Sequence, residues 1–184
     1  MNRKTRRNGA ARLRDTLLLA VLTCLGTPHT QAAPIQEADK QRLIVTTDLG
    51  GTDPDDTQSM IHLLLCSNTI DLEGIISSQV WSDYPDRVEA IKNVVNRFCE
   101  VIPRLNKHAD GFPDAAYLTS IVKNGQSKSN MDGVGEGKDS PGSELIIAAV
   151  DKRGDKRPVW IAAWGGMNNV AQALWKVAHT RSPE

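Results

Sequence analysis

The part of the chain best suited to chemistry is an acidic loop. It holds four carboxylates within nine residues: Asp48, Asp53, Asp55 and Asp56. Carboxylates this close repel one another unless something neutralises them, and a hard divalent cation with oxygen ligands does so. A helix N-terminus favours one or two acids through its dipole, but it does not account for four. The spacing therefore predicts a metal site.

The elements around the loop are expected to hold it at a ligand-binding position. Residues 43–47 form a short β-branched run that predicts a buried strand, and Gly50 and Gly51 allow a tight turn after it. Pro54 with its acidic neighbours predicts the start of a helix. That helix carries apolar residues at helical spacing: Met60, Ile61, Leu64 and Leu65. In open parallel sheets, ligands bind beyond the carboxyl ends of the strands, where this loop lies.

The rest of the chain continues the alternation of strands and helices. Further strands are predicted at 72–78 and 158–163, and helices near 88–98, 143–150 and 170–177, with a loop-rich stretch at 103–141 that contains a short helix near 113–123. This order predicts an α/β fold, an open and mostly parallel sheet with helices on both faces. With only three clear strands before Glu184, the sheet would keep an uncovered edge, so we expect a truncated C-terminus.

The N-terminus predicts export. Residues 1–32 combine a basic segment, the apolar run 17–25 and small residues, which is typical of a signal peptide cleaved after Ala32. They contain six of the 22 Lys and Arg residues and one of the 22 acidic residues, so the remainder has a net charge near −5. That balance excludes the basic face of a nucleic-acid-binding protein. The expected organisation is a signal peptide (1–32), a polar lead-in (33–41) and one domain (42–184), periplasmic or secreted, with no membrane contact after cleavage.

Other side chains permit two interpretations each. Cys66 and Cys99 could form a bridge in an oxidising compartment, but two buried free thiols fit their apolar neighbours better. A lone helical histidine, His62, is expected to be structural or exposed. Trp160 is expected in the core rather than as a sugar platform. Residues 81–83 (Trp-Ser-Asp) fit substrate contact and a cap on the core equally well, and His108 with Asp110 fits a solvated loop.

Two motifs resemble the nucleoside hydrolase superfamily. The segment 47–56, Thr-Asp-Leu-Gly-Gly followed by Pro-Asp-Asp, resembles its Asp-rich opening motif with a short insertion. The segment 164–174, Trp-Gly-Gly-Met-Asn-Asn-Val-Ala-Gln-Ala-Leu, resembles its second motif, a turn that opens a helix. Segments 132–137 and 139–145 are similar to a secreted bacterial branch of cellulose-binding, nucleoside-hydrolase-like proteins. The resemblance covers about residues 42–182.

The resemblance implies a calcium site with assigned roles. Asp48 would bind Ca²⁺ and act as the base on a metal-bound water, Asp56 would be a bidentate ligand, and the backbone carbonyl of Trp164 would be a third ligand. Asp55 would hold the ribose 2-hydroxyl, and Asn168 would also bind substrate. Asp53 lies in the insertion and inherits no role.

The function implied is hydrolysis of an N-glycosyl or related glycosidic bond with a calcium-activated water. The protein would be an exported glycosidase whose substrate is a nucleoside or a sugar. The alternative is a non-catalytic protein that binds cellulose or another polysaccharide and keeps the metal pocket. A calcium-stabilised fold without a sugar ligand is the third possibility. The family's late calcium-binding Asp and neighbouring His have no counterpart before Glu184, so we expect the 184-residue chain itself to be inactive.

Overall fold

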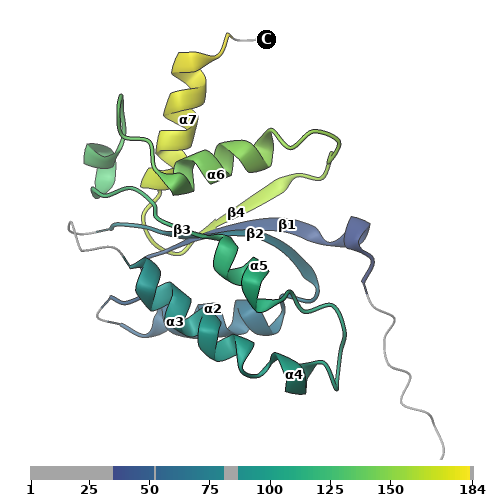
Figure 1. Ribbon diagram of the computed structural model, residues 1–184. Helices are drawn as coiled ribbons and strands as arrows, with labels where there is room; N and C mark the ends of the chain where they lie inside the picture. The colour runs from purple at the N-terminus through teal and green to yellow at the C-terminus, as the bar shows by residue number, and fades with distance from the viewer. Residues whose placement is uncertain (1–34, 52, 81–86, 183–184) are drawn as a thin grey trace, which may run out of the picture. The chain divides into compact units, whose positions relative to one another are not determined.

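One parallel sheet organises the part of the chain that a computed structural model describes, residues 35–51, 53–80 and 87–182 (Figure 1). Its strands are ordered β3-β2-β1-β4, and all three pairings are parallel. The strands are β1 (Gln41–Thr47), β2 (Ile70–Ser77), β3 (Val122–Lys123) and β4 (Val159–Ala163). The predicted α/β class with a parallel sheet is confirmed.

Helices cover both faces of this sheet, as expected. On one side lie α2 (Asp55–Leu65), α3 (Val88–Cys99) and α5 (Ala115–Ser120), and on the other α6 (Pro141–Val150) and α7 (Asn168–Thr180) (Figure 1). Three short elements complete the described part: α4 (Ile102–Leu105) and the 3-10 turns η2 (Glu37–Asp39) and η3 (Asn130–Gly133). Pro141 in the first turn and a reciprocal capping box between Ser140 and Ser143 begin α6.

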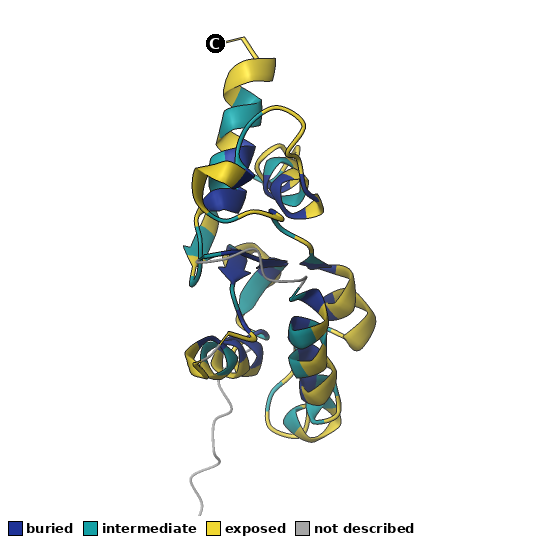
Figure 2. Cartoon of the chain, turned by 90° about the vertical axis from the view of Figure 1, so that its left-hand side faces the viewer, coloured by how far each residue is buried: buried dark blue, intermediate teal, exposed yellow. Residues whose placement is uncertain are grey.

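The core consists of two apolar layers, one on each face of the sheet. Successive side chains of a strand point to opposite faces. Val45 therefore packs with α2 and α3, whereas Ile44 packs with α6 and α7. Figure 2 shows the buried strands between the two sets of helices. The strand β1 is thus flanked by β2 and β4 and covered on both faces.

The edge strand β4 corrects one expectation. Trp160 was expected in the core, but its side chain is 60% exposed. Its indole Nε1 donates a hydrogen bond to Gln41 Oε1 over 3.2 Å. The reason is its position: β4 pairs with β1 only, and within the described residues no strand lies on its other side. A strand pattern alone does not distinguish an edge from a centre.

Three smaller expectations also change. The strand β3 was not predicted, because two residues are too few to show a periodic pattern. Ile61 and Leu65 are 47% and 44% exposed, whereas Met60 and Leu64 are fully buried, so α2 has a narrower apolar face than its sequence suggests. The free thiols are confirmed, but Cys66 is exposed and only Cys99 is half-buried.

Two predictions lie outside the described residues, the signal peptide and the segment 81–83. Within the ranges that are described, no helix has both the length and the apolarity to cross a membrane.

Candidate functional site

Three strands end together at the predicted site. The amide of Ser78 donates to the carbonyl of Thr47 over 2.8 Å, and the amide of Trp164 donates to the carbonyl of Thr46 over 2.9 Å. Backbone pairing thus continues past the formal ends of β2 and β4. As a result, Asp48, the first residue after β1, lies between the ends of its two neighbouring strands. This is the ligand-binding edge of a parallel sheet.

Asp56 is held against the end of β1 from the first turn of α2. Its side chain is buried, with the residue 7% exposed. Carboxylate Oδ2 accepts a short hydrogen bond from the hydroxyl of Thr47 and a second bond, 3.1 Å, from the amide of Asp48. The Asp56 amide donates to Asp55 Oδ1 over 2.8 Å. The bonds from Thr47 and Asp48 hold Oδ2 against the end of β1.

Among the described residues, no cationic side chain forms an ion pair with the carboxylate of Asp56. Burial raises its pKa, the hydrogen bond from Thr47 opposes that rise, and the nearby carboxylates of Asp48 and Asp55 add to it, so the net pKa lies above the ordinary value. Within the described part of the chain, neither Asp48 nor Asp56 forms an ion pair. A cation bound between them would lower this pKa again.

A glycine after β4 makes room for the carboxylate of Asp48. A Cβ atom on Gly165 would lie 2.5 Å from Ser78 Oγ and 3.0 Å from both the amide nitrogen and Oδ1 of Asp48. Any larger residue would therefore displace one of these groups. The glycine at this position thus allows β4 to approach β1 closely.

Ser78 is a residue that sequence reasoning missed. It is fully buried, and its hydroxyl has no hydrogen-bond partner in the described structure. Buried hydroxyls are normally satisfied, so an orphaned one beside an acid requires an explanation. Its only sequence signal is its place at the end of β2, which the periodic pattern located to within one residue.

Arg87, just before α3, is a second residue that was missed. Its guanidinium Nη1 donates to the carbonyl oxygen of Asp48, and it lies 3.4 Å from where a Cβ of Gly51 would be. This bond ties the start of α3 to the acidic loop. Nothing in the local sequence indicates it, because the two residues are 39 positions apart.

The four loop acids do not converge. Asp53 and Asp55 are exposed, in contrast to the buried Asp56 and half-buried Asp48. No three of the loop acids place carboxylate oxygens within the 4.8 Å that defines a three-acid metal group among the described residues. Of the four acids that predicted a metal site, Asp53, which was given no role, and Asp55 lie at the surface. The pair Asp48–Asp56 remains.

The other two predicted residues lie at the same edge of the sheet. Trp164 is half-buried and packs against the apolar layer of α2 and α3. Asn168, the first residue of α7, is buried, and its Nδ2 donates to the carbonyl of Lys128 over 2.7 Å. Asn168 Oδ1 accepts from the amide of Asn169. The substrate role of Asn168 stays a prediction, now with the restriction that one of its two amide N–H groups already donates to Lys128.

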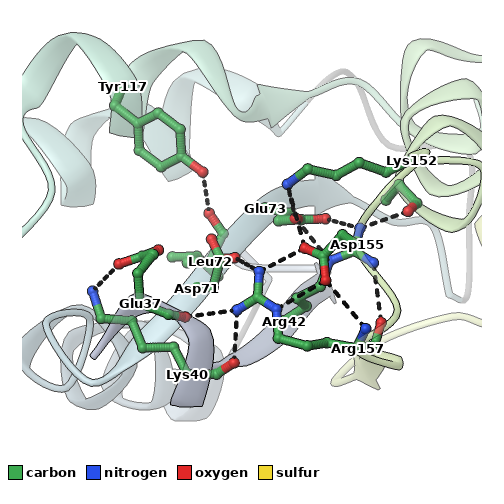
Figure 3. A network of polar contacts seen from close by, with 11 residues as sticks. Glu37, Lys40, Arg42, Asp71, Leu72, Glu73, Tyr117, Lys152, Asp155 and Arg157 are labelled. Carbon is green, nitrogen blue, oxygen red and sulfur yellow. Dashed lines mark hydrogen bonds and ion pairs between the residues drawn. The ribbon is translucent and has the colours of Figure 1, made fainter. Parts of the chain in front are cut away.

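A different acidic group meets the geometric requirement for a metal. Asp71, Glu73 and Asp155 each offer an oxygen within 4.8 Å of the others, at the amino end of the sheet. Figure 3 shows that cationic side chains already occupy it. Arg42 bonds both oxygens of Glu73, at 2.9 and 2.8 Å, and Lys152 reaches Glu73 Oε1 at 2.8 Å.

Arg157 completes this network. Its Nη2 lies 2.7 Å from Asp71 Oδ2 and 2.6 Å from Asp155 Oδ2. The bond from Arg157 is the main cause that holds the pKa of Asp155 well below its usual range. For Glu73, burial raises the pKa, but the bonds from Arg42 and Lys152 outweigh it and lower it overall. Three acids balanced by three bases form a structural ion network, and a metal would have to displace the bases.

Two cavities lie at opposite ends of the sheet. One of about 430 Å³ borders the ion network and is lined by Lys40, Asp71, Tyr117 and Arg157 among others. The smaller, about 270 Å³, lies at the carboxyl end, where Gly166 and Asn168 line it. The larger cavity is thus remote from Asp48. His62 and His108 are exposed, and we assign them no place in the site.

Comparison with known proteins agrees with this arrangement. A family model described as "Cellulose-binding Sde182, nucleoside hydrolase-like domain" matches residues 42–184. The chain belongs to this family. The match begins within β1 and includes every residue of the Asp48 site.

A solved structure supports the same relationship. It is that of a nucleoside hydrolase-related hypothetical protein from Saccharophagus degradans that is associated with carbohydrate metabolism, and it is 49% identical to this chain with a TM-score of 0.71. The similarity covers 78% of this chain and 34% of that one, so this chain spans about a third of the length of that relative. Comparison with curated proteins gives no match.

Proposed function

We propose that this chain carries the calcium-binding and base-bearing part of an exported hydrolase that cleaves an N-glycosyl or related glycosidic bond. The observation that carries the proposal is the pair formed by the half-buried Asp48 and the buried Asp56 at the end of the central strand. Its acids lack an ion-pair partner within the described residues, and the pKa of Asp56 is raised. The family and the carbohydrate-associated relative support a sugar-containing substrate.

The residues present fit a calcium ion. Calcium takes six to eight oxygen ligands, including carboxylates and backbone carbonyls. Asp48, Asp56 and the carbonyl of Trp164 would hold it, and the orphaned hydroxyl of Ser78 is a further oxygen at the same strand ends. When bound, calcium would orient a water, lower its pKa and bind sugar hydroxyls.

The chain's own groups have separate tasks in this reaction. Thr47 and the amide of Asp48 hold Asp56 Oδ2, which fixes the second carboxylate relative to the first. Asp48 takes the proton of the attacking water, and such general-base catalysis contributes on the order of 10²–10⁴-fold in rate. The exposed Asp55 is free to meet a sugar hydroxyl from the solvent side. Cleavage develops positive charge on the sugar ring, which the acidic loop stabilises.

The decisive experiment compares two neutral variants of the same loop. Calcium should raise the melting temperature of the parent. At a calcium concentration of 100 times the Kd, the free energy of unfolding should rise by about 2.7 kcal/mol. Asp56→Asn should abolish that shift. Asp53→Asn removes the same charge from an exposed position, and this variant should keep the calcium-induced rise in melting temperature. An equal calcium response in parent and Asp56→Asn would refute the site.

Catalysis requires its own test, because the matched part of this chain covers only 34% of its solved relative. Nucleosides and p-nitrophenyl riboside are the substrates, assayed with calcium in the longest natural form of the protein. Asp48→Asn should lower turnover at least 100-fold while Asp53→Asn keeps it. We propose little turnover for the 184-residue chain alone. Equal turnover by the 184-residue chain and the longest natural form would contradict that part.

The second candidate is a cellulose-binding protein without catalysis, favoured by the cellulose-binding description of the family. It predicts calcium binding and retention on cellulose, with no turnover of any nucleoside or riboside. A pull-down on microcrystalline cellulose with and without calcium distinguishes the two. Retention together with turnover would mean that both functions reside in one protein.

Export is proposed from residues 1–32, whose basic and apolar segments are typical of a signal peptide. Mass spectrometry of the protein recovered outside the cytoplasm should show a chain beginning near Ala33. Recovery of intact Met1 there would contradict cleavage.

A further inference from the structure

The larger cavity, about 430 Å³, lies at the amino end of the sheet, away from Asp48. It is bordered by the segment before β1, the start of β2, the segment before β4 and α5. Its volume is within the range of about 300–1,000 Å³ that is usual for small-molecule pockets. Ligands of open parallel sheets normally bind at the carboxyl ends of the strands, so a ligand at this end requires evidence of its own.

The charges around this cavity cancel. Four acidic and four basic side chains lie together at this end of the sheet (Figure 3): Glu37, Asp71, Glu73, Asp155, Lys40, Arg42, Lys152 and Arg157. Each of the bases already forms an ion pair with one of the acids. A charged ligand would have to separate such a pair and leave one partner uncompensated, which is costly where the pair is buried. The cavity therefore favours a ligand without net charge.

Three groups on the cavity wall keep hydrogen-bonding capacity. The side chain of Lys40 is 10% exposed, and its one ion pair among the described residues, 2.9 Å, is with Glu37, which leaves its other N–H donors free. Asp71 accepts from Arg157 through Oδ2, at 2.7 Å, and its Oδ1 has no bond within the described chain. Tyr117 donates its hydroxyl hydrogen to a backbone carbonyl of β2 over 2.9 Å, so the hydroxyl oxygen can still accept.

The rest of the wall is apolar. Ile70, Leu72, Pro113 and Tyr117 line the cavity beside these polar groups. Burial, with help from nearby carboxylates, raises the pKa of Tyr117, so its hydroxyl stays protonated. A ring with C–H groups on its faces and hydroxyls along its edge matches such a wall. A wholly apolar ligand would instead bury the polar groups of the wall without partners, which costs free energy.

We propose that this cavity binds one unit of a neutral saccharide, at a site separate from the acids at the carboxyl end of the sheet. A hydroxyl group both donates and accepts, so adjacent hydroxyls of the sugar can accept from Lys40 and donate to Asp71 Oδ1 without breaking an ion pair. The hydroxyl oxygen of Tyr117 accepts from a further one. The site needs no metal, so it goes beyond the proposed function and does not depend on it.

The first test varies the charge of the ligand. Glucose, glucuronate and glucosamine share a pyranose ring and are neutral, anionic and cationic at slightly acidic pH. They are titrated into the full chain by isothermal titration calorimetry, with a calcium chelator present. Glucose should bind at least tenfold more tightly than either charged analogue. Equal or tighter binding of a charged analogue, or no binding of glucose, would overturn the proposal.

Two lysines with the same kind of partner test the place of binding. Lys40→Met removes the buried donor and keeps a side chain of similar size, so glucose should bind at least tenfold more weakly. Lys92 also lies 2.9 Å from a glutamate three positions earlier, but it is on α3 and does not line the cavity. Lys92→Met should bind glucose as the parent does. If both variants bound glucose equally well, the cavity would not be the site.

A second variant guards against misfolding of Lys40→Met. Pro113 is half-buried, lines the cavity and lies outside the helices and strands, so an indole at this position should fill the cavity without disturbing the core. Pro113→Trp should weaken glucose binding at least tenfold and keep a melting temperature close to that of the parent. Parent-like glucose binding by this variant would overturn the assignment to the cavity.

One further variant separates this site from the proposed function. Asp56→Asn should lose the calcium response and still bind glucose as the parent does, because Asp56 lies at the other end of the sheet. Glucose binding in a protein without a calcium response would sustain the saccharide site and refute the calcium site. Loss of glucose binding in Asp56→Asn would place the sugar at the carboxyl end, and the amino-end site would fail.

Discussion

The two ends of one sheet handle acidic residues in opposite ways. At the amino end, Asp71, Glu73 and Asp155 are matched by three basic side chains, and the pKa values of Glu73 and Asp155 are lowered. At the carboxyl end, Asp48 and Asp56 have no ion-pair partner in the described chain, and the pKa of Asp56 is raised. The first group is neutralised from within, so it stabilises the fold. The second has no such internal neutralisation among the described residues, which is why we propose it as the site.

This difference explains why closeness of carboxylates is a poor guide to metal binding. The amino-end group meets the distance requirement for three metal ligands, but its oxygens are already bonded to guanidinium and ammonium groups. The carboxyl-end pair offers fewer oxygens, but they are accompanied by an orphaned hydroxyl and a glycine that makes room for them. We therefore distinguish a structural group of acids from a candidate metal site by whether basic side chains of the protein already neutralise the acids.

Breaking the amino-end network should have the largest effect. Arg42 is 1% exposed and bonds Glu73 through two nitrogens. Arg42→Met would leave the largely buried Glu73 without its main partner, while Asp155 keeps Arg157, and should lower the free energy of unfolding by about 3–5 kcal/mol, measured by urea denaturation. Arg181→Met removes the exposed pair with Asp151 and should cost far less, because solvent screens such pairs. Equal losses would mean that the network is not stabilising.

At the carboxyl end, filling the space beside Asp48 should have the next largest effect. The added methyl of Gly165→Ala meets Ser78 Oγ at 2.5 Å and Asp48 Oδ1 at 3.0 Å. We expect about 1–3 kcal/mol of destabilisation and a loss of calcium binding. Gly51→Ala, whose Cβ would make only contacts of 3.4 Å or more, is the control and should do neither. Parent-like calcium affinity in Gly165→Ala would show that the approach of β4 is not needed.

The two ends should respond to pH with opposite signs. A raised pKa in the folded state means that Asp56 stabilises the metal-free fold at low pH and loses that contribution as pH rises through its raised pKa. The lowered pKa values of Glu73 and Asp155 contribute stability above the ordinary carboxyl pKa, and it is lost as pH falls through the lowered values.

Denaturation across pH without metal provides the measurement. Metal-free Asp56→Asn should be at least as stable as the parent at neutral pH and should lose that advantage on acidification. Calcium affinity of the parent should fall as pH drops through the raised pKa of Asp56, because protonation removes a ligand. If metal-free Asp56→Asn were less stable than the parent at neutral pH, ionised Asp56 would stabilise the fold, and the predicted direction of its effect would be wrong.

The smallest effect is expected at Ser78. Ser78→Ala removes a buried hydroxyl without a partner, so stability should not fall, while calcium affinity should drop a few-fold. Ser77→Ala on the same strand is the converse control. Its hydroxyl accepts from the amide of Gly125 over 3.1 Å, so its loss should cost about 1 kcal/mol and leave calcium affinity unchanged. Unchanged calcium affinity in Ser78→Ala would remove it from the site.

Local pattern predicted much of this molecule. The β-branched run before Asp48, the start of a helix at Pro54 and the amphipathic spacing of α3 each depend on neighbours within a few positions, and the structure has these elements where the pattern indicates them. It was less successful where the pattern is short or incomplete. The two-residue β3 has no period to detect, and Trp160 occupies an edge that an alternating strand does not disclose.

The sequence by itself determined the alternation of the longer strands and helices, the family resemblance, and the place of Asp48 directly after a strand, because propensity, periodicity and motif spacing are local properties. Only the tertiary structure decided which acids meet. It pairs Asp48 with Asp56 and leaves Asp53 and Asp55 in solvent. It also brings Arg157 to Asp71 across 86 positions of the chain. Charge compensation depends on distances in space, and such distances between residues far apart in the chain exist only once both faces of the sheet are packed.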